Sequence, residues 1–269
     1  MSNKLSTQVA LSIPRLDAGL KLEVHSRGDT HISEQIRKEG IWEAFETELV
    51  RRSLKPGHAF LDAGANLGYF TIVGAQCVGE AGRVYAFEPE PRNFALLQSN
   101  IALNGFEGRV TAFQQALSDR TGAAQLYLHP DNLGDHRLHA DDGSSIRVDL
   151  VSGAEALGDI ELNLVKVDVQ GAEYTAILGL MPLLRKSAAG LRMIVELTPR
   201  ALRKAGSSGA ALIDSLETLG LPFAIVDHLE HRLVPHSAEE LRQWCNNVDE
   251  YPDDEGFMNI FMGEPPTDC

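Results

Sequence analysis

Residues 60–70 read Phe-Leu-Asp-Ala-Gly-Ala-Asn-Leu-Gly-Tyr-Phe, and this stretch decides the fold. An apolar run typical of a buried strand ends at Asp62, a glycine-rich turn follows, and a helix-compatible segment continues from Leu67 to Cys77. Gly64 and Gly68 let the backbone turn tightly and approach a ligand closely, where a side chain would obstruct it. The stretch therefore predicts a strand, a tight turn and a helix that together hold a nucleotide-type cofactor.

Outward from this turn, strands and helices continue to alternate along the chain. Strands separated by helices predict an open, doubly wound α/β fold, with a mostly parallel sheet covered on both faces. Ligands are then expected at the carboxyl ends of the strands. The runs that predict the later strands are 83–87, 110–117, 164–169, 193–197, 223–226 and 258–262, and helices are expected at 93–103, 173–180 and 209–219.

The N-terminal region lies outside this alternation. Residues 1–57 precede the first core strand and contain an amphipathic helix candidate from Ile41 to Leu54. We expect this segment to form an N-terminal helical cap on a single domain formed by residues 58–269. Trp42 and Phe45 in the cap are either core residues or a platform for an adenine ring.

An insertion at about residues 119–160 replaces the helix expected after the third strand. Strand-like segments at 124–128 and 146–150 flank a polar loop at 130–143. Long insertions in compact domains are often functional, and this one can fold over the strand ends. Side chains of the loop that can hydrogen-bond the hydroxyl groups of a substrate are the expected substrate-binding residues. They are Asn132, Asp135, His136 and Arg137.

The charge of the glycine-rich turn selects among cofactors. A dinucleotide fingerprint would have glycine where Asn66 stands, and the carboxylate of Asp62 would repel a pyrophosphate. S-adenosyl-L-methionine has no phosphate and presents an ammonium and a sulfonium. Glu88, which closes the second strand, can accept two hydrogen bonds from a ribose diol. S-adenosyl-L-methionine is therefore the expected cofactor, and a tight turn that binds nothing is the alternative.

Four segments together resemble a known family. They are FLDAGANLGYF at 60–70, AFEPEP at 86–91, ALSDRTG at 116–122 and LVKVDVQGAE at 164–173. In order and spacing they closely resemble the motifs of FkbM-type S-adenosylmethionine-dependent methyltransferases, over about residues 40–200. The resemblance implies a Rossmann-like seven-stranded methyltransferase sheet with an antiparallel last strand, and methylation of hydroxyl groups of sugars and natural products. The chain departs from the family at Gln170, where a glutamate is usual.

The turn and the resemblance together assign the cofactor site. Trp42 and Glu43 are similar to an aromatic-glutamate pair of the family, which brings Glu43 into this site. The expected cofactor-binding residues are Glu43, Asp62, Gly64, Asn66, Gly68, Glu88, Pro89, Ala116, Leu117 and Asp168.

Methyl transfer needs an acceptor oxygen held behind the methyl group and one base to remove its proton. The expected catalytic residues are Asp168, His136 and Glu196. Asp168 ends the fourth strand, beside the expected sulfonium, or instead caps the next helix. The ordinary pKa of His136 suits proton removal near neutral pH, but a solvated loop histidine is the plain alternative. Glu196 ends the fifth strand and either faces the same pocket or pairs with a surface cation.

Charge and composition limit the partners. The 269 residues carry 38 acidic and 24 basic side chains, a net charge of −14, which would repel a nucleic-acid backbone or an anionic membrane surface. The chain has neither a signal-peptide core nor a run of about 18 apolar residues. Its three cysteines lie far apart, which favours a cytoplasmic location. A small hydroxylated acceptor is the expected partner. The oligomeric state stays undecided, with a homodimer as one alternative.

The sequence thus predicts an S-adenosylmethionine-dependent O-methyltransferase that acts on a sugar or on a glycosylated or polyketide-type natural product. A nicotinamide-dependent oxidoreductase and a catalytically silent cofactor-binding scaffold are the competing functions. We expect no metal, because Gln170 removes a carboxylate from the fourth motif. The spacing of His228 and His231 suits two metal ligands, but no third ligand accompanies them.

Overall fold

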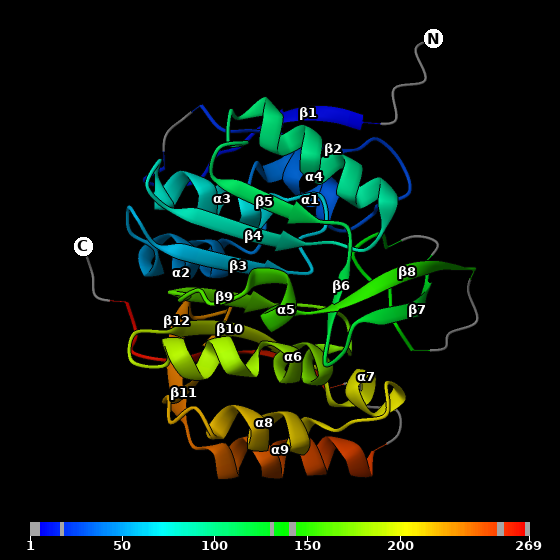
Figure 1. The fold of residues 1–269 in the computed structure, drawn as a ribbon, viewed down its shortest axis with the longest axis vertical. Coiled ribbons are helices and arrows are strands. Elements are labelled where there is room, and N and C mark those ends of the chain that lie inside the picture. The colour runs from blue at the N-terminus through cyan, green and yellow to red at the C-terminus, as the bar shows by residue number, and fades with distance from the viewer. Residues whose placement is uncertain (1–5, 17–18, 130–131, 140–143, 252–255, 267–269) are drawn as a thin grey trace.

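The structure, a computed structural model, describes residues 6–16, 19–129, 132–139, 144–251 and 256–266. Its centre is an eight-stranded sheet with the order β12-β11-β13-β10-β9-β3-β4-β5 (Figure 1). The strands of this sheet are β3 (Ala59–Ala63), β4 (Arg83–Phe87), β5 (Val110–Phe113), β9 (Leu164–Val167), β10 (Arg192–Leu197), β11 (Phe223–Asp227), β12 (Arg232–His236) and β13 (Met258–Met262).

The direction of the strands confirms the predicted fold class. Strands β5, β4, β3, β9 and β10 pair in parallel, and β13, the last strand, pairs antiparallel with both β10 and β11. These seven strands form the expected methyltransferase sheet. The eighth strand, β12, was not predicted; it pairs antiparallel with β11 at the edge, in the hairpin that Asp227 and Arg232 close.

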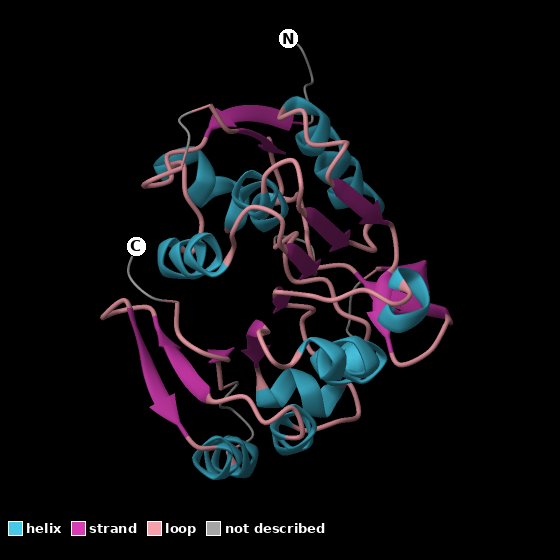
Figure 2. Cartoon of the chain, turned by 60° about the vertical axis from the view of Figure 1, so that its left-hand side comes forward, coloured by secondary structure: helices cyan, strands magenta, loops and turns pink. Residues whose placement is uncertain are grey.

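Helices cover both faces of the sheet, and the sheet divides the core in two (Figure 2). Strands β3 and β9 are buried along nearly their whole length because both of their faces are covered, which explains their continuous apolar runs. One face carries α1 (Ile32–Glu39), α2 (Ala44–Ser53), α3 (Tyr69–Val78) and α4 (Pro91–Leu103), and the other α5 (Gly153–Leu157), α6 (Glu173–Ser187), α7 (Pro199–Lys204), α8 (Gly209–Glu217) and α9 (Ala238–Glu250).

The N-terminal cap is more than a helix. Helix α2 confirms the predicted amphipathic helix, but α1 and a two-stranded antiparallel sheet of β1 (Ser6–Ala10) and β2 (Lys21–His25) precede it. Strand β2 lies against α4, where Asn100 Nδ2 donates to the carbonyl oxygen of Glu23 at 2.9 Å. The alternation of buried Leu22 and Val24 with more exposed neighbours explains why this segment forms a strand.

The prediction of one third strand over 110–117 was wrong. The chain leaves the main sheet after β5, and β6 (Ala116–Ser118) joins β7 (Gly122–Tyr127) and β8 (Ser145–Ser152) in a separate sheet with the order β6-β8-β7. This sheet confirms both strand-like segments of the insertion. Of the predicted polar loop, residues 130–131 and 140–143 lie outside the described residues.

Candidate active site

A cavity of about 350 Å³ lies at the carboxyl ends of β3, β4, β9 and β10, where the doubly wound fold predicts a ligand. Its walls come from the glycine-rich turn, the strand ends, the start of the cap and the inserted loop. Among the sequence-predicted residues, those that line it are Glu43, Gly64, Asn66, Glu88, Pro89, Ala116, Leu117, Asn132, Asp135, His136, Asp168 and Glu196. Gly68 is instead the N-cap of α3, and Asp62 and Arg137 also lie outside the lining.

The glycine-rich turn is built against the end of the neighbouring strand. Gly64 has a φ of 85°, and a Cβ at this position would stand 1.8 Å from the carbonyl oxygen of Asp168. The backbone amides of Gly64 and Ala65 both donate to the carbonyl oxygen of Phe87. Both the conformation and the close contact therefore require glycine at residue 64.

Glu88 is held at the end of β4 with its carboxylate aimed at the turn. Its two oxygens accept hydrogen bonds from the backbone amides of Asn66 and Glu90, each at 2.8 Å. Burial, with the nearby carboxyls of Glu90 and Asp62, raises the pKa of Glu88 to about 8. Each oxygen keeps a second lone pair, so this side chain can accept the hydrogen bonds of a vicinal diol.

Asp62 does not contact the cavity, although the sequence reasoning placed it beside the cofactor. Its side chain is 2% exposed and accepts a hydrogen bond from Thr71 Oγ1 at 2.6 Å, beneath the turn. Burial raises the pKa of this carboxyl to about 6. Asp62 therefore links the end of β3 to α3 by a hydrogen bond.

A group of charged residues, of which Lys166 and Glu46 are buried, forms the next wall. Lys166 Nζ lies 3.0 Å from Asp168 Oδ2 and 3.6 Å from Glu46 Oε2, and it also stands over the ring of Phe70. Glu43 lines the cavity, and its Oε2 is buried without a hydrogen-bond partner. Burial and the neighbouring Glu46 carboxyl raise the pKa of Glu43 to about 8. This wall suits a cationic ligand group.

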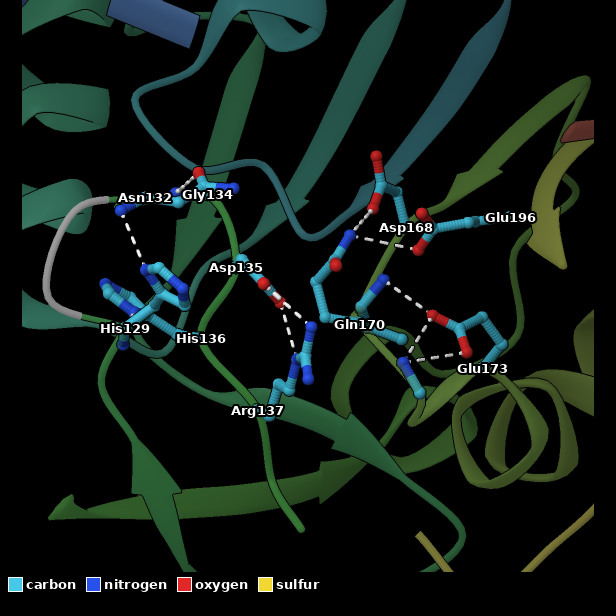
Figure 3. Close-up of polar contacts among 12 residues, drawn as sticks. His129, Asn132, Gly134, Asp135, His136, Arg137, Asp168, Gln170, Glu173 and Glu196 are labelled. Atoms are coloured by element: carbon cyan, nitrogen blue, oxygen red, sulfur yellow. Dashed lines mark hydrogen bonds and ion pairs between the residues drawn. The ribbon is translucent and has the colours of Figure 1, made fainter. Parts of the chain in front are cut away.

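Three side chains lie close together at the carboxyl ends of β9 and β10, those of Asp168, Gln170 and Glu196 (Figure 3). The Nε2 atom of Gln170 donates to Asp168 Oδ1 at 2.7 Å and to Glu196 Oε2 at 3.0 Å. Burial and the Asp168 carboxylate raise the pKa of Glu196 well above its ordinary value. Burial alone would also raise the pKa of Asp168, but the Lys166 ammonium beside it holds that pKa below its ordinary value.

The alternative role of Asp168 as a helix cap is wrong. Glu173, the first residue of α6, instead accepts the backbone amides of Val169 and Gly171 (Figure 3). The alternative for Glu196, a surface pair, is also wrong, because this residue is 8% exposed and lines the cavity. Both carboxyls are therefore placed where a ligand can reach them.

The inserted loop lies over the glycine-rich turn. The carbonyl oxygen of Leu133 accepts hydrogen bonds from Asn93 Nδ2 at 2.9 Å and from Asn66 Nδ2 at 3.5 Å. Asp135 forms a two-pronged ion pair with Arg137, and the Asn132 side chain accepts the backbone amide of Gly134 (Figure 3). The loop thus covers the end of the cavity that the turn forms, and much of its polarity is used within the loop.

The geometry of His136 argues against its expected role as the base. Its Nδ1 accepts the backbone amide of His129 at 3.1 Å, and burial lowers its pKa. We therefore assign the proton of the neutral ring to Nε2. The ring then offers a donor through Nε2, whereas a base needs a free lone pair there.

Residues that the sequence analysis missed surround the acidic wall. Glu46 accepts a hydrogen bond from Asn259 of β13, and His228 Nε2 lies 3.4 Å from Glu46 Oε1. Lys166 lies in the fourth motif, two residues before Asp168. This position in the sequence could have identified it as a residue of the site. Phe45 is a buried core residue stacked on His231 at 5.6 Å, whereas Trp42 lines the cavity.

Neither metal ligation nor a membrane span is indicated by the part of the chain that the structure describes. No group of three or more histidine, cysteine, aspartate or glutamate side chains is placed to hold a metal ion there. Among the same residues, no helix combines the length and the apolar character needed to cross a bilayer.

Comparison with known proteins identifies the family. The model of the methyltransferase FkbM domain matches residues 62–244. Methyltransferase 1 of Beauveria bassiana (strain ARSEF 2860) is 29% identical over 150 residues, covering 46% of this chain and 59% of the relative. The 31-O-demethyl-FK506 methyltransferase FkbM of Streptomyces tacrolimicus is 31% identical over 123 residues, covering 45% and 46%. The chain therefore spans about half the length of the curated relatives that it matches.

A solved structure of methyltransferase FkbM from Methylobacillus flagellatus KT has a TM-score of 0.45 and 14% identity. It covers 81% of this chain and 51% of its own.

Proposed function

This chain belongs to the FkbM methyltransferase family, and we propose that it transfers a methyl group from S-adenosyl-L-methionine to a hydroxyl of a small acceptor. The observation that carries the proposal is a pair of carboxyls, the half-buried Asp168 and the buried Glu196, in the wall of the cavity that also holds the glycine-rich turn and Glu88. Such a site places groups that can accept a proton next to a cofactor-binding turn.

The cofactor is S-adenosyl-L-methionine, and the residues present fit it. The unpartnered Oε2 of Glu43 suits a cationic group, and both oxygens of Glu88 can accept from a ribose diol. Phe87, Leu117 and Leu126 give the cavity an apolar wall that suits an adenine ring. When bound, the cofactor supplies a methyl group on a positively charged sulfur.

In the proposed reaction the protein mainly positions the acceptor and removes its proton. The acceptor oxygen has to approach the methyl carbon from the side opposite the sulfur, so orientation dominates the rate. Asp168 and Glu196, held by Gln170, are the carboxyls that orient the acceptor hydroxyl and receive its proton. The inserted loop limits the access of water at the other end of the cavity, where it covers the turn.

We propose a sugar or a polyketide-type natural product as the acceptor. The name of the Streptomyces tacrolimicus relative describes a methyltransferase of 31-O-demethyl-FK506. The net charge of −14 also favours a small acceptor over a nucleic acid.

The test measures formation of S-adenosylhomocysteine with pairs of acceptors. Each pair is a sugar or polyketide with a free hydroxyl and the same compound with that hydroxyl blocked. We expect product from the free hydroxyl alone. If the protein binds S-adenosylhomocysteine but no acceptor in a broad panel turns over, the scaffold function gains support.

His136→Ala separates the two assignments of the base. If Asp168 or Glu196 takes the proton, this variant should keep the rate of the chemical step within a few-fold and lose cofactor affinity, because the loop covers the turn. A loss of roughly 10²-fold or more in the single-turnover rate, with unchanged cofactor affinity, would restore His136 as the base.

A further inference from the structure

The cavity wall contains more carboxyl groups than cations. Among the described residues that line it, Lys166 is the single lysine or arginine, and its ammonium is already paired with Asp168 at 3.0 Å. Glu43, Glu88 and Glu196 are further carboxyls of the same lining. Carboxylates that share a cavity poor in water repel one another, so some of them keep their protons while no cationic ligand is bound.

Glu196 is the carboxyl of this lining whose buried surroundings most clearly favour the protonated form. It faces Asp168 and Lys166 from the β9 side and Glu173 from α6, and across β13 its register partner is Asn259. The one cation among these neighbours lies against Asp168, while Glu196 accepts the neutral amide of Gln170, at 3.0 Å. Burial and the Asp168 carboxylate raise the pKa of Glu196 well above the ordinary value of a carboxyl. A protonated Glu196 cannot act as a base.

We propose that Glu196 loses its proton when S-adenosyl-L-methionine binds, in response to the positive charge of the sulfonium, and that the carboxylate so formed is the base for the acceptor hydroxyl. The inference rests on the proposed function for its second half only. A cation in the same cavity favours the charged form of a nearby carboxyl, whereas the thioether of S-adenosylhomocysteine carries no such charge.

The charge of the cavity is then conserved through the reaction. The acceptor oxygen gives its proton to Glu196 and forms a bond to the methyl carbon, whose bond to sulfur breaks with the electron pair remaining on sulfur. The positive charge on sulfur and the negative charge on Glu196 disappear together. The protein that holds the product S-adenosylhomocysteine therefore returns to the protonated Glu196 of the empty cavity.

Calorimetry tests the first half without any acceptor. S-adenosyl-L-methionine and S-adenosylhomocysteine are titrated into the whole chain at neutral pH, each in two buffers with different ionisation enthalpies, which gives the number of protons released by each ligand. We expect S-adenosyl-L-methionine to release up to about one proton more than S-adenosylhomocysteine. Equal release by the two ligands would overturn the proposal.

Variants assign the released proton to a residue. Glu196→Gln should abolish the difference between the two ligands, while Glu196→Asp, which keeps an ionisable group, should retain it. Glu90→Gln is the matched control, because Glu90 is also a buried carboxyl but does not line the cavity, and it should retain the difference. If Glu196→Gln leaves the difference intact, or if Glu90→Gln removes it, Glu196 is not the group that ionises.

The two halves can fail separately. Proton release specific to S-adenosyl-L-methionine, without methylation of any hydroxyl acceptor, would leave the ionisation of Glu196 standing and refute its role as the base for O-methylation. S-adenosylhomocysteine affinity provides the check on folding, since Glu196→Gln should change it by less than about threefold. A variant that no longer binds S-adenosylhomocysteine is replaced by Glu196→Asp, whose loss of the difference would count against the proposal.

Discussion

Gly64→Ala tests whether the close contact of the turn with the end of β9 shapes the cofactor site. Gly64 combines a φ of 85° with a position where a Cβ would lie 1.8 Å from the carbonyl oxygen of Asp168. That oxygen belongs to the backbone, so the added methyl group can be accommodated only if the turn or the strand end moves. Movement of residue 168 also displaces the cavity wall that contains Asp168 and Glu196. The affinity for the cofactor and the stability of the protein should therefore fall together.

The magnitude follows from two costs. An alanine in the left-handed region costs roughly 1–2 kcal/mol, and forcing a methyl group into a packed site costs about 1–3 kcal/mol more. Gly105→Ala is the matched control, because Gly105 has a φ of 68° but no atom within 4 Å of its added Cβ. The control therefore has the first cost and lacks the second.

Urea unfolding and calorimetric titration with S-adenosylhomocysteine measure the two effects. We expect Gly64→Ala to be less stable than Gly105→Ala by about 1–3 kcal/mol and to bind S-adenosylhomocysteine at least about tenfold more weakly. Gly105→Ala should bind it as the unaltered chain does. Equal stability and equal affinity of the two variants would refute the argument that the turn is fitted against β9.

Three further predictions concern the cofactor, the metal and the pH. Glu88→Ala should weaken S-adenosylhomocysteine binding at least about tenfold, because it removes two hydrogen bonds to the ribose diol that contribute roughly 0.5–1.5 kcal/mol each; unchanged affinity in calorimetry would remove Glu88 from the ribose site. Activity should persist in EDTA, and loss of activity with recovery on adding Mg²⁺ would contradict the expected metal independence. The raised pKa of Glu88, about 8 against an ordinary 4.5, makes the folded empty protein lose stability relative to the unfolded chain as pH rises between those values. Glu88→Gln should therefore gain stability relative to the unaltered chain from pH 5 to pH 8 in urea unfolding, and a constant difference would show that the pKa is not raised.

Much of the fold was predictable because it depends on local patterns. Apolar runs mark the buried strands of a parallel sheet, and the glycines of the turn reflect a backbone conformation that other residues rarely adopt. The position of Glu88 in the cavity lining was predictable too, since it depends on the place of this residue at a strand end. The break between β5 and β6 was not, because residues 110–117 form one continuous strand-like run in the sequence and only tertiary pairing divides them.

The chemistry of single side chains was harder to predict. Asp62 and Asp168 both end parallel strands, yet Asp62 accepts a hydrogen bond from Thr71 beneath the turn while Asp168 reaches the cavity. The tautomer of His136 depends on a backbone amide seven residues away. The pairing of Lys166 with Glu46 joins β9 to the N-terminal cap, and such a contact between distant segments leaves no trace in either segment alone.

The fate of a labelled methyl group tests the central claim most directly. The chain is incubated with methyl-labelled S-adenosyl-L-methionine and a hydroxylated acceptor that turns over, and NMR of the product identifies the atom that carries the label. We expect the label on oxygen, at a rate that falls by roughly 10²–10⁴ in Glu196→Gln. A label on nitrogen or carbon would contradict O-methylation, and an undiminished rate in Glu196→Gln would contradict Glu196 as the base.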